Sequence, residues 1–475
     1  MIFNAVTEFL KNPRKSFFFF LLIGVMVVIC SSNIPFYWDN ITLSENACFH
    51  YDNSIYKIIP PTKSDFGNLT LYAYYLSVFW TIFGKSIFIS HIAIIPIVIG
   101  VFQEIKKITL HFIKPEYLFL IYLLLLLDPA ISAQLILIGY DVFLLYFVLL
   151  AIRTLLEKKY LFYSICLLIL STISIRAIIY IFCLLLIHWM ILIFIKKNNI
   201  KILDALVYLP ALIFLVLFST FHYEKTGWIF VNPDNIKHTS LNNISMALRQ
   251  YGFIIWKIID SGRIALWIFV IVCGFVFFKR RKISNECKKL LLLLIIPIVI
   301  NGIVMVIISN PIGHKYFLQT YVFLSIIVVY FLQNIVSFKK RFLYFSIFIV
   351  FLVGGNFIVY PQKYGNAWDT SLKVLPYFKL EQKMRAFVVI KKINPKEIYT
   401  EFPLNSDFKY SYLQDDFSYN ELVADDITSY KFVLWSNVLN VANLKPYELV
   451  QQNWKLIYSI SSGQISFKLY KNPLF

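Results

Sequence analysis

The chain has 475 residues, of which 59% are hydrophobic and 18% aromatic, and it carries a formal net charge of +19. Because a soluble domain is only about half apolar, these proportions exclude a single water-soluble domain. The apolar residues form runs of roughly 15–22 residues separated by short charged breaks, which is the pattern of membrane-spanning helices. The sequence therefore predicts an all-α polytopic membrane protein with about 11 transmembrane helices. A small C-terminal α/β domain follows them.

The first apolar run follows a basic stretch, and no small-residue cleavage site comes after it, so we interpret it as an uncleaved helix. We assign residues 1–360 to a multi-pass membrane domain and residues 361–475 to an extracytoplasmic domain. Two segments between spans, 35–85 and 222–262, are long and mix aromatic with charged side chains. In chain order, the predicted spans are residues 17–34, 86–103, 115–128, 140–154, 160–175, 177–195, 203–221, 263–278, 289–308, 316–334 and 342–359.

The positive charges lie in short clusters at the ends of apolar runs, such as "KNPRK", "FKRRK" and "SFKKR". This distribution is the positive-inside signature and not a nucleic-acid-binding face, so no nucleic-acid partner is predicted. It predicts a multi-pass protein of the inner (plasma) membrane, with a cytoplasmic N-terminus and an extracytoplasmic C-terminus. The six cysteines are scattered, so the sequence indicates no disulfide framework.

The long segment after the first span begins "NIPFYWDNITLSENACFHYDNS" and places several acids among aromatic residues. Its second part, "LTLYAYYLSVFWTIFGKS", is aromatic-rich and too short to cross a bilayer, which favours an interfacial amphipathic helix. After Tyr360 the composition changes. "YKFVLWSNV", "WKLIYSI" and "QISFKLYKN" alternate like strands, the last two as a hairpin around "SSG". "YFKLEQKMRAFVVIKKI" has helical spacing.

No glycine-rich phosphate loop, HExxH, paired CxxC or GxSxG motif occurs in the chain, which argues against an ATP-driven pump. The candidates for chemistry are ionisable residues predicted at the outer ends of helices. They are Asp39, Asp52, Asp65, Asp128, Asp141, Arg176, His314 and Lys315.

Four stretches over roughly residues 1–360 resemble the type C glycosyltransferase fold, which includes the protein O-mannosyltransferases and the bacterial lipid A aminoarabinose transferases. "FYWDN" is similar to the acidic motif after the first helix of that fold, and "KSDFGNLTLYAYYLSVFWTIFGKSIFISH" to the interfacial segment that follows. "DPAISAQLILIGYDVFLLYFVLLAIR" resembles the third and fourth helices, and "NPIGHKYFLQTY" the late outer loop. The chain departs from the pattern where Asn40 follows Asp39, where "NLT" replaces His-Pro-Pro, and where His314, Lys315 and Tyr316 replace Arg-Tyr.

The resemblance implies a glycosyltransferase that takes a sugar from a polyprenyl-phosphate donor at the membrane surface. The acceptor is an unidentified glycan, lipid or protein. Carried over by position, the catalytic carboxylate is Asp39, which would act on the acceptor hydroxyl while cations hold the phosphate leaving group. The predicted substrate- or phosphate-binding residues are Arg176, Lys315, His314, Tyr316, Lys63, Asp52, Asp65, Asp128 and Asp141.

Each assignment has a structural alternative. Asp39 could instead cap an interfacial helix, and Asp141 could complement a helix dipole. Arg176, a cation between two apolar runs, could pair with Asp128 or Asp141. A divalent metal at His50 and Asp52 would rest on two nearby ligands only, which is weak evidence.

Two other functions also fit the sequence. The first is a non-catalytic scaffold with the same fold. The second is a transporter or flippase of a lipid-linked intermediate, which would place polar residues and broken helices at mid-membrane depth.

Overall fold

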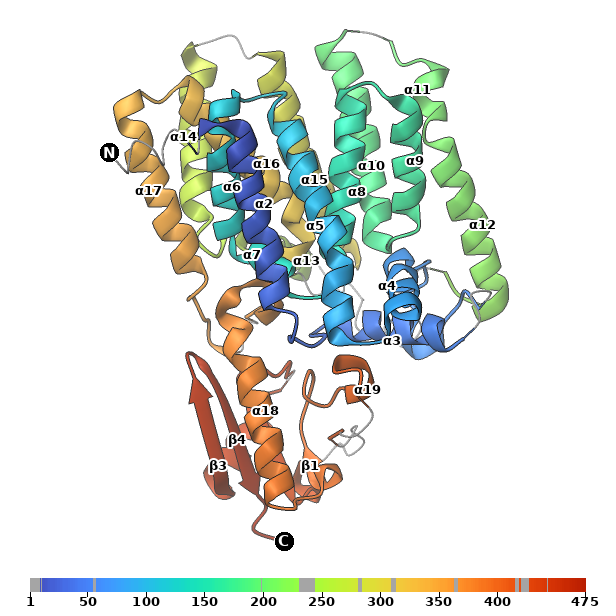
Figure 1. The fold of residues 1–475 in the computed structure, drawn as a ribbon, viewed down its shortest axis with the longest axis vertical. Helices are drawn as coiled ribbons and strands as arrows, with labels where there is room; N and C mark the ends of the chain where they lie inside the picture. The colour runs from blue at the N-terminus through green and yellow to red at the C-terminus, as the bar shows by residue number, and fades with distance from the viewer. Residues whose placement is uncertain are drawn as a thin grey trace.

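The computed structural model describes residues 9–475 except 10, 54–56, 198, 230–243, 281–283, 309–312, 363–365, 415–417, 420–426 and 442. Long helices stand side by side in a bundle, and a smaller domain with a β-sheet lies at one end of it (Figure 1). We call this the domain end of the bundle.

Every predicted span coincides with a helix. Within the described residues, five helices are long and apolar enough to cross a membrane, and two bent pairs raise that number to seven. The prediction of a polytopic α-helical membrane protein is confirmed. The helices that coincide with the predicted spans are α2 (Pro13–Cys30), α5 (Ile87–Thr109), α6 (Leu118–Leu127), α8 (Tyr140–Leu156), α9 (Tyr160–Ser171), α10 (Ile175–Met190), α12 (Leu209–Thr226), α14 (Ile264–Arg280), α15 (Asn285–Ile308), α16 (Leu318–Asn334) and α17 (Phe338–Gly355).

Basic residues mark the bundle end opposite the small domain. Helix α5 carries Lys106 and Lys107 in its last turn, α8 carries Arg153 in its last turn, and α17 carries Lys340 in its first turn. These three helix ends all lie away from the domain end (Figure 1). This arrangement agrees with the positive-inside pattern, although the direction in which the protein sits in a membrane stays a prediction.

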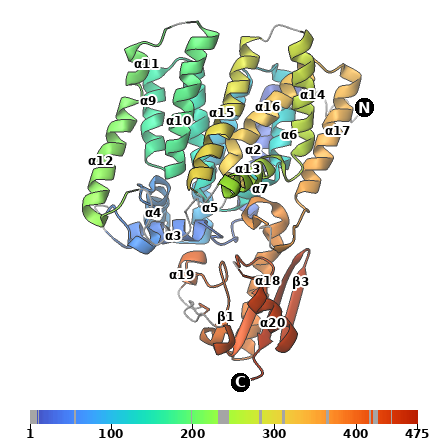
Figure 2. The same cartoon turned by 180° about the vertical axis from the view of Figure 1, so that it is seen from behind.

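Short helices gather at the domain end. They are α3 (Asn40–Asp52), α4 (Leu71–Phe83), α7 (Pro129–Ile136) and α13 (Ile244–Ile259). At 13 residues, α4 is too short to cross a bilayer, as predicted. Helices α7 and α13 continue from or into spanning helices through sharp bends, of 71° between α6 and α7 and 92° between α13 and α14. Both lie toward the domain end in the two opposite views (Figures 1 and 2).

The turn between α13 and α14 packs directly on the backbone of α17. Gly262 has a φ of +82°, and a Cβ on it would lie 1.9 Å from the carbonyl oxygen of Phe351. A Cβ on Gly355 would lie 2.1 Å from the carbonyl oxygen of Ser261. Only glycine permits so close an approach, and the contact fixes the bend against α17.

The C-terminal domain contains a four-stranded sheet of order β1-β2-β4-β3. Strand β1 (Ile398–Tyr399) is parallel to β2 (Phe432–Ser436), and β4 (Ile465–Lys471) is antiparallel to β2 and to β3 (Lys455–Ser462). Helix α18 (Leu375–Ile390) packs on β3 and β4. The predicted helix and hairpin of this domain are confirmed. The domain also contains the short helices α19 (Phe408–Ser411) and α20 (Lys445–Asn453).

The core of this domain continues into the membrane part. Its buried cluster includes Tyr37, from the loop after α2, and Leu137, from the end of α7. Tyr37 contacts the rings of Tyr377 and Phe378, at centroid distances of 5.1 and 5.3 Å. The domain is therefore docked on the first loop through an apolar interface, and the division predicted at residue 360 stays a prediction.

We predict that Gly355→Ala destabilises the protein, whereas the neighbouring Gly354→Ala does not. The first adds a methyl group that meets the backbone of Ser261, and the second points into open space. Overpacking of this kind costs about 1–3 kcal/mol. Thermal unfolding of the two purified variants in detergent should give a lower midpoint for Gly355→Ala alone. Equal midpoints would contradict the close packing of the turn on α17.

Candidate active site

Lys315 joins two acids that come from distant parts of the chain. Its Nζ lies 2.7 Å from Oδ2 of Asp39 and 2.6 Å from Oδ2 of Asp369. The Lys315 side chain is 3% exposed and that of Asp369 is 4% exposed, whereas the Asp39 side chain is 42% exposed. The buried acid therefore holds the lysine from within, while the exposed acid faces the side from which a substrate can approach.

Arg176 forms the second cationic centre. Its Nη1 lies 2.6 Å from Oδ1 of Asp141, and its Nη2 hydrogen-bonds the hydroxyl of Tyr140. The guanidinium stacks over the Tyr140 and Tyr316 rings, 4.6 and 4.1 Å from their centroids. The hydroxyl of Tyr180 donates to the carbonyl oxygen of Tyr316 and fixes its backbone. Arg176 is thus oriented from three sides.

The two cationic centres line one shared cavity. Its polar lining includes Asp141, Arg176, Lys315, Tyr316 and Gln319. Sequence reasoning selected the first four of these residues, and they converge here. Helices α8, α10 and α16 and the 3₁₀ turn His314–Phe317 before α16 supply them.

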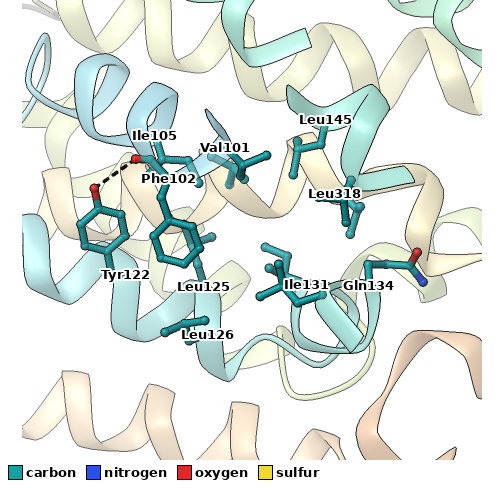
Figure 3. A pocket seen from close by; sticks show the side chains of 13 residues that line it. Val101, Phe102, Ile105, Tyr122, Leu125, Leu126, Ile131, Gln134, Leu145 and Leu318 are labelled. Carbon is teal, nitrogen blue, oxygen red and sulfur yellow. Dashed lines mark hydrogen bonds between the residues drawn. The ribbon is translucent and has the colours of Figure 1, made fainter. Parts of the chain in front are cut away.

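A second, apolar cavity adjoins the first. Side chains from α5, α6, α7, α8 and α16 line it, among them Phe102, Leu125 and Ile131 (Figure 3). Leu145 and Leu318 line both cavities. Apolar space thus lies directly against the charged cavity.

The local backbone directs Asp39 toward Lys315. Asp39 stands at the N-cap position of α3 but makes no side-chain cap hydrogen bond, so its carboxylate is not used for capping. Trp38, just before it, has a φ of 58°, which is an unfavourable conformation for a bulky residue. On the other side, Gly139 allows the Asn40 side chain to approach the start of α8, because a Cβ there would lie 2.8 Å from Asn40 Oδ1.

The two acids on Lys315 differ in their electrostatics. Burial would raise the pKa of Asp39, but the charge and hydrogen bond of Lys315, with Arg176 behind it, outweigh burial and lower that pKa. Burial raises the pKa of Asp369, and the nearby negative charges of Asp39 and Asp141 add to this effect although Lys315 opposes it. Asp369 is therefore the acid that takes up a proton more readily.

Three other predicted residues have separate partners outside this cavity. Asp128 makes a bidentate pair with Arg263, at 2.6 and 2.7 Å, and its Oδ1 also caps α7. Asp65 lies 2.9 Å from His222. His314 lies 3.0 Å from Asp260.

Of the remaining predictions, Asp52 is exposed in the last turn of α3, and the side chain of Lys63 lies outside the described residues. His50 stacks on Tyr74, with ring centroids 3.7 Å apart. Within the described part of the chain, no group of three or more His, Cys, Asp or Glu residues could hold a metal ion.

Sequence reasoning missed Asp369, Tyr140 and Arg263. Asp369 lies in the 3₁₀ turn Trp368–Thr370, which packs on α7, and the Gln134 side chain donates to its carbonyl oxygen at 2.8 Å. A signal was present, because Asp369 and Asp39 each follow a tryptophan that comes shortly after a spanning helix.

This chain has a helical bundle with short helices at one end, and an acid from the first loop meets cations from later helices there. The type C glycosyltransferase fold has the same architecture. The chain is similar to the crystal structure of ArnT from Cupriavidus metallidurans bound to undecaprenyl phosphate, with a TM-score of 0.50 and 11% identity. The match covers 96% of this chain and 97% of that one. No protein-family model and no curated protein sequence matches. At this identity the likeness shows the fold, and it confirms the resemblance drawn from the sequence.

We predict that Arg263→Met lowers the free energy of unfolding by about 3–5 kcal/mol, because it leaves the Asp128 carboxylate buried without its cation. The Arg263 side chain is fully buried. Lys431→Met is the matched control, because Lys431 pairs with Glu397 while both side chains are about two-fifths exposed, and such pairs contribute about 0–1 kcal/mol. Adding Asp128→Asn to Arg263→Met should recover stability, since Asn still caps α7. Equal stability losses for Arg263→Met and Lys431→Met would contradict a structural role for the buried pair.

Proposed function

We propose that the protein is an inverting membrane glycosyltransferase that moves a sugar from a polyprenyl-phosphate carrier to an acceptor. The observation that carries this proposal is the convergence of Asp39, Lys315 and Arg176 at the domain end of the bundle. An exposed carboxylate beside two oriented cations provides what transfer from a phosphate leaving group requires. Apolar side chains lie directly against the charged cavity, as a ligand with an anionic head and a hydrocarbon chain would require.

The chemistry follows from these positions. The carboxylate of Asp39 accepts the proton of the acceptor hydroxyl as the hydroxyl oxygen attacks the anomeric carbon. The bond between that carbon and the phosphate oxygen breaks, and the carrier phosphate leaves with the electron pair. Arg176 and Lys315 stabilise the negative charge that develops on the phosphate. Attack opposite the leaving group inverts the anomeric configuration.

Donor binding also strengthens Asp39 as a base. In the empty site, Lys315 lowers the pKa of Asp39 and so weakens it as a base. A phosphate that takes a hydrogen bond from Lys315 reduces the cationic charge felt by Asp39, so its pKa rises. Asp39 therefore becomes a better proton acceptor when the donor is in place.

A transporter would need broken helices at mid-membrane depth. The two bent pairs meet each other through Asp128 and Arg263, and α7 and α13 contact the turn that carries Lys315. Their positions at the domain end argue against a transport path. A scaffold has no use for an exposed acid directed at a buried lysine, which argues against the non-catalytic alternative.

We also propose the side of the membrane on which the reaction takes place. The domain end would face the extracytoplasmic side of the inner membrane, because the basic helix ends lie at the opposite end of the bundle. The C-terminal domain contacts the two residues that precede Asp39, because Tyr377 packs on Tyr37 and Phe402 packs on Trp38. It would therefore help to recognise the acceptor.

We predict that Asp39→Asn abolishes sugar transfer but leaves carrier binding intact. Loss of a general base lowers rates by about 10²–10⁴-fold. Transfer is measured by mass spectrometry of envelope glycans and glycolipids in a strain lacking the gene and carrying each variant. Binding of undecaprenyl phosphate to the purified protein in detergent is measured separately. Lys315→Met should weaken that binding about tenfold or more, since hydrogen bonds to charged groups contribute about 1.5–3 kcal/mol.

Asp52→Asn is the matched control, because Asp52 lies exposed at the far end of the same helix. It should leave product and binding unchanged. Normal product from well-expressed Asp39→Asn would overturn the catalytic assignment. Failure of the wild-type protein to bind undecaprenyl phosphate would overturn the choice of donor.

A further inference from the structure

The acids that contact the two cavity cations outnumber them. Lys315 and Arg176 are in direct ion pairs with Asp39, Asp141 and Asp369. In an occupied site these cations must also hold a phosphate group. A phosphate placed beside three ionised carboxylates would be repelled at short range, where low exposure to water leaves the repulsion poorly screened.

We propose that Asp369, supplied by the C-terminal domain, takes up a proton when the phosphate of the carrier enters the site. This inference rests on the proposed function. It makes Asp369 a positioning residue: as a carboxylate it holds Lys315 in the empty site, and as a neutral acid it releases the lysine charge to the phosphate. The proton comes from water, and no covalent bond other than the O–H bond is formed.

Geometry selects Asp369 among the three acids. Asp141 is held by Arg176, whose charge is permanent, so a proton there would break a strong pair. Asp39 is the most exposed of the three and can turn toward water or the acceptor hydroxyl. Asp369 is buried against α7 and cannot turn away, so protonation is the way in which its charge can be removed.

Charged groups face Asp369 from several elements. Lys315 precedes α16, Asp39 precedes α3, and Asp141 lies in the first turn of α8. Lys257 of α13 and Lys373 of the following 3₁₀ turn add positive charge nearby. Tyr37 is also close, and burial raises its own pKa, so it stays neutral. Despite the three lysines, burial and the two neighbouring acids keep the pKa of Asp369 raised.

The sign of the effect on binding follows from linkage. An incoming phosphate raises the pKa of Asp369 further, so the bound state holds more protons than the free state. Affinity for phosphate therefore falls as the pH rises from the pKa of Asp369 in the free protein toward the pKa of Asp369 in the complex. Uptake of one proton changes the Kd by up to about tenfold per pH unit.

The test measures the Kd of undecaprenyl phosphate for the full-length protein in detergent between about pH 6 and about pH 8. Asp369→Asn is nearly isosteric and removes the titrating group. The phosphate also titrates in this range, but it does so equally with both proteins, so the difference between them isolates Asp369. We expect the wild-type Kd to rise with pH by up to about tenfold per unit relative to the Kd of the variant.

Glu381→Gln is the matched control. Glu381 is a buried acid of the same domain, and burial raises its pKa to about 6, but its partners Arg385 and Tyr412 lie away from Lys315. This variant should keep the wild-type pH dependence. If Glu381→Gln removes the pH dependence and Asp369→Asn retains it, the effect comes from the stability of the domain, and the inference is overturned.

A second measurement counts the protons directly. Calorimetry of binding in two buffers of different ionisation enthalpy gives the number of protons taken up by the wild-type protein and by Asp369→Asn. Larger uptake by the wild-type protein, at a pH where the free phosphate is already fully ionised, supports the inference, and equal uptake by the two proteins overturns it. Absence of any binding by the wild-type protein would instead overturn the choice of donor in the proposed function.

Discussion

The structure depends on one buried ammonium group. A lysine charge removed from water is costly, and the cost is offset only when carboxylates meet it at hydrogen-bonding distance. Lys315 meets that demand with one acid from the first loop and one from the C-terminal domain. Three distant segments must therefore converge at the start of α16 before the lysine can be buried. The candidate active site is thus also the joint between the two parts of the chain.

Hydrogen bonds of the residues near Lys315 fix the frame that holds it. His314, the preceding residue, lies 3.0 Å from Asp260 and 3.2 Å from the hydroxyl of Thr370. The Asp260 turn is itself held by Arg263, whose Nη1 donates to the carbonyl oxygen of Asp260. These contacts tie the bend between α13 and α14 to the residue beside Asp369. They explain why predicted site residues such as His314 and Asp128 lie near the cavity without lining it.

Hydropathy was enough to predict the bundle, because a bilayer requires long apolar runs whose length and order can be read directly. Arg176 stood out for the same reason, since a lone cation between apolar runs needs a partner. The sequence could not decide between Asp128 and Asp141 as that partner. The decision depends on the bend at Asp128 and on Arg263, which forms the ion pair with Asp128 instead. Asp369 was missed because it lies 330 residues from Asp39, and no periodicity links a loop acid to a turn in another domain.

The loop that carries Asp39 depends on the C-terminal domain for its conformation. Trp38 holds a positive φ, which costs on the order of 1–3 kcal/mol in a residue of its size, so neighbouring contacts must offset that cost. The Trp38 ring packs edge-on against Phe402, and the Tyr37 ring packs on Tyr377. Both partners belong to the C-terminal domain. If the domain separated from the bundle, the loop would lose these aromatic contacts, and Lys315 would lose its contact with Asp369 at the same time. Domain docking and the geometry of the candidate site are therefore coupled by the same residues, and the C-terminal domain contributes directly to that site.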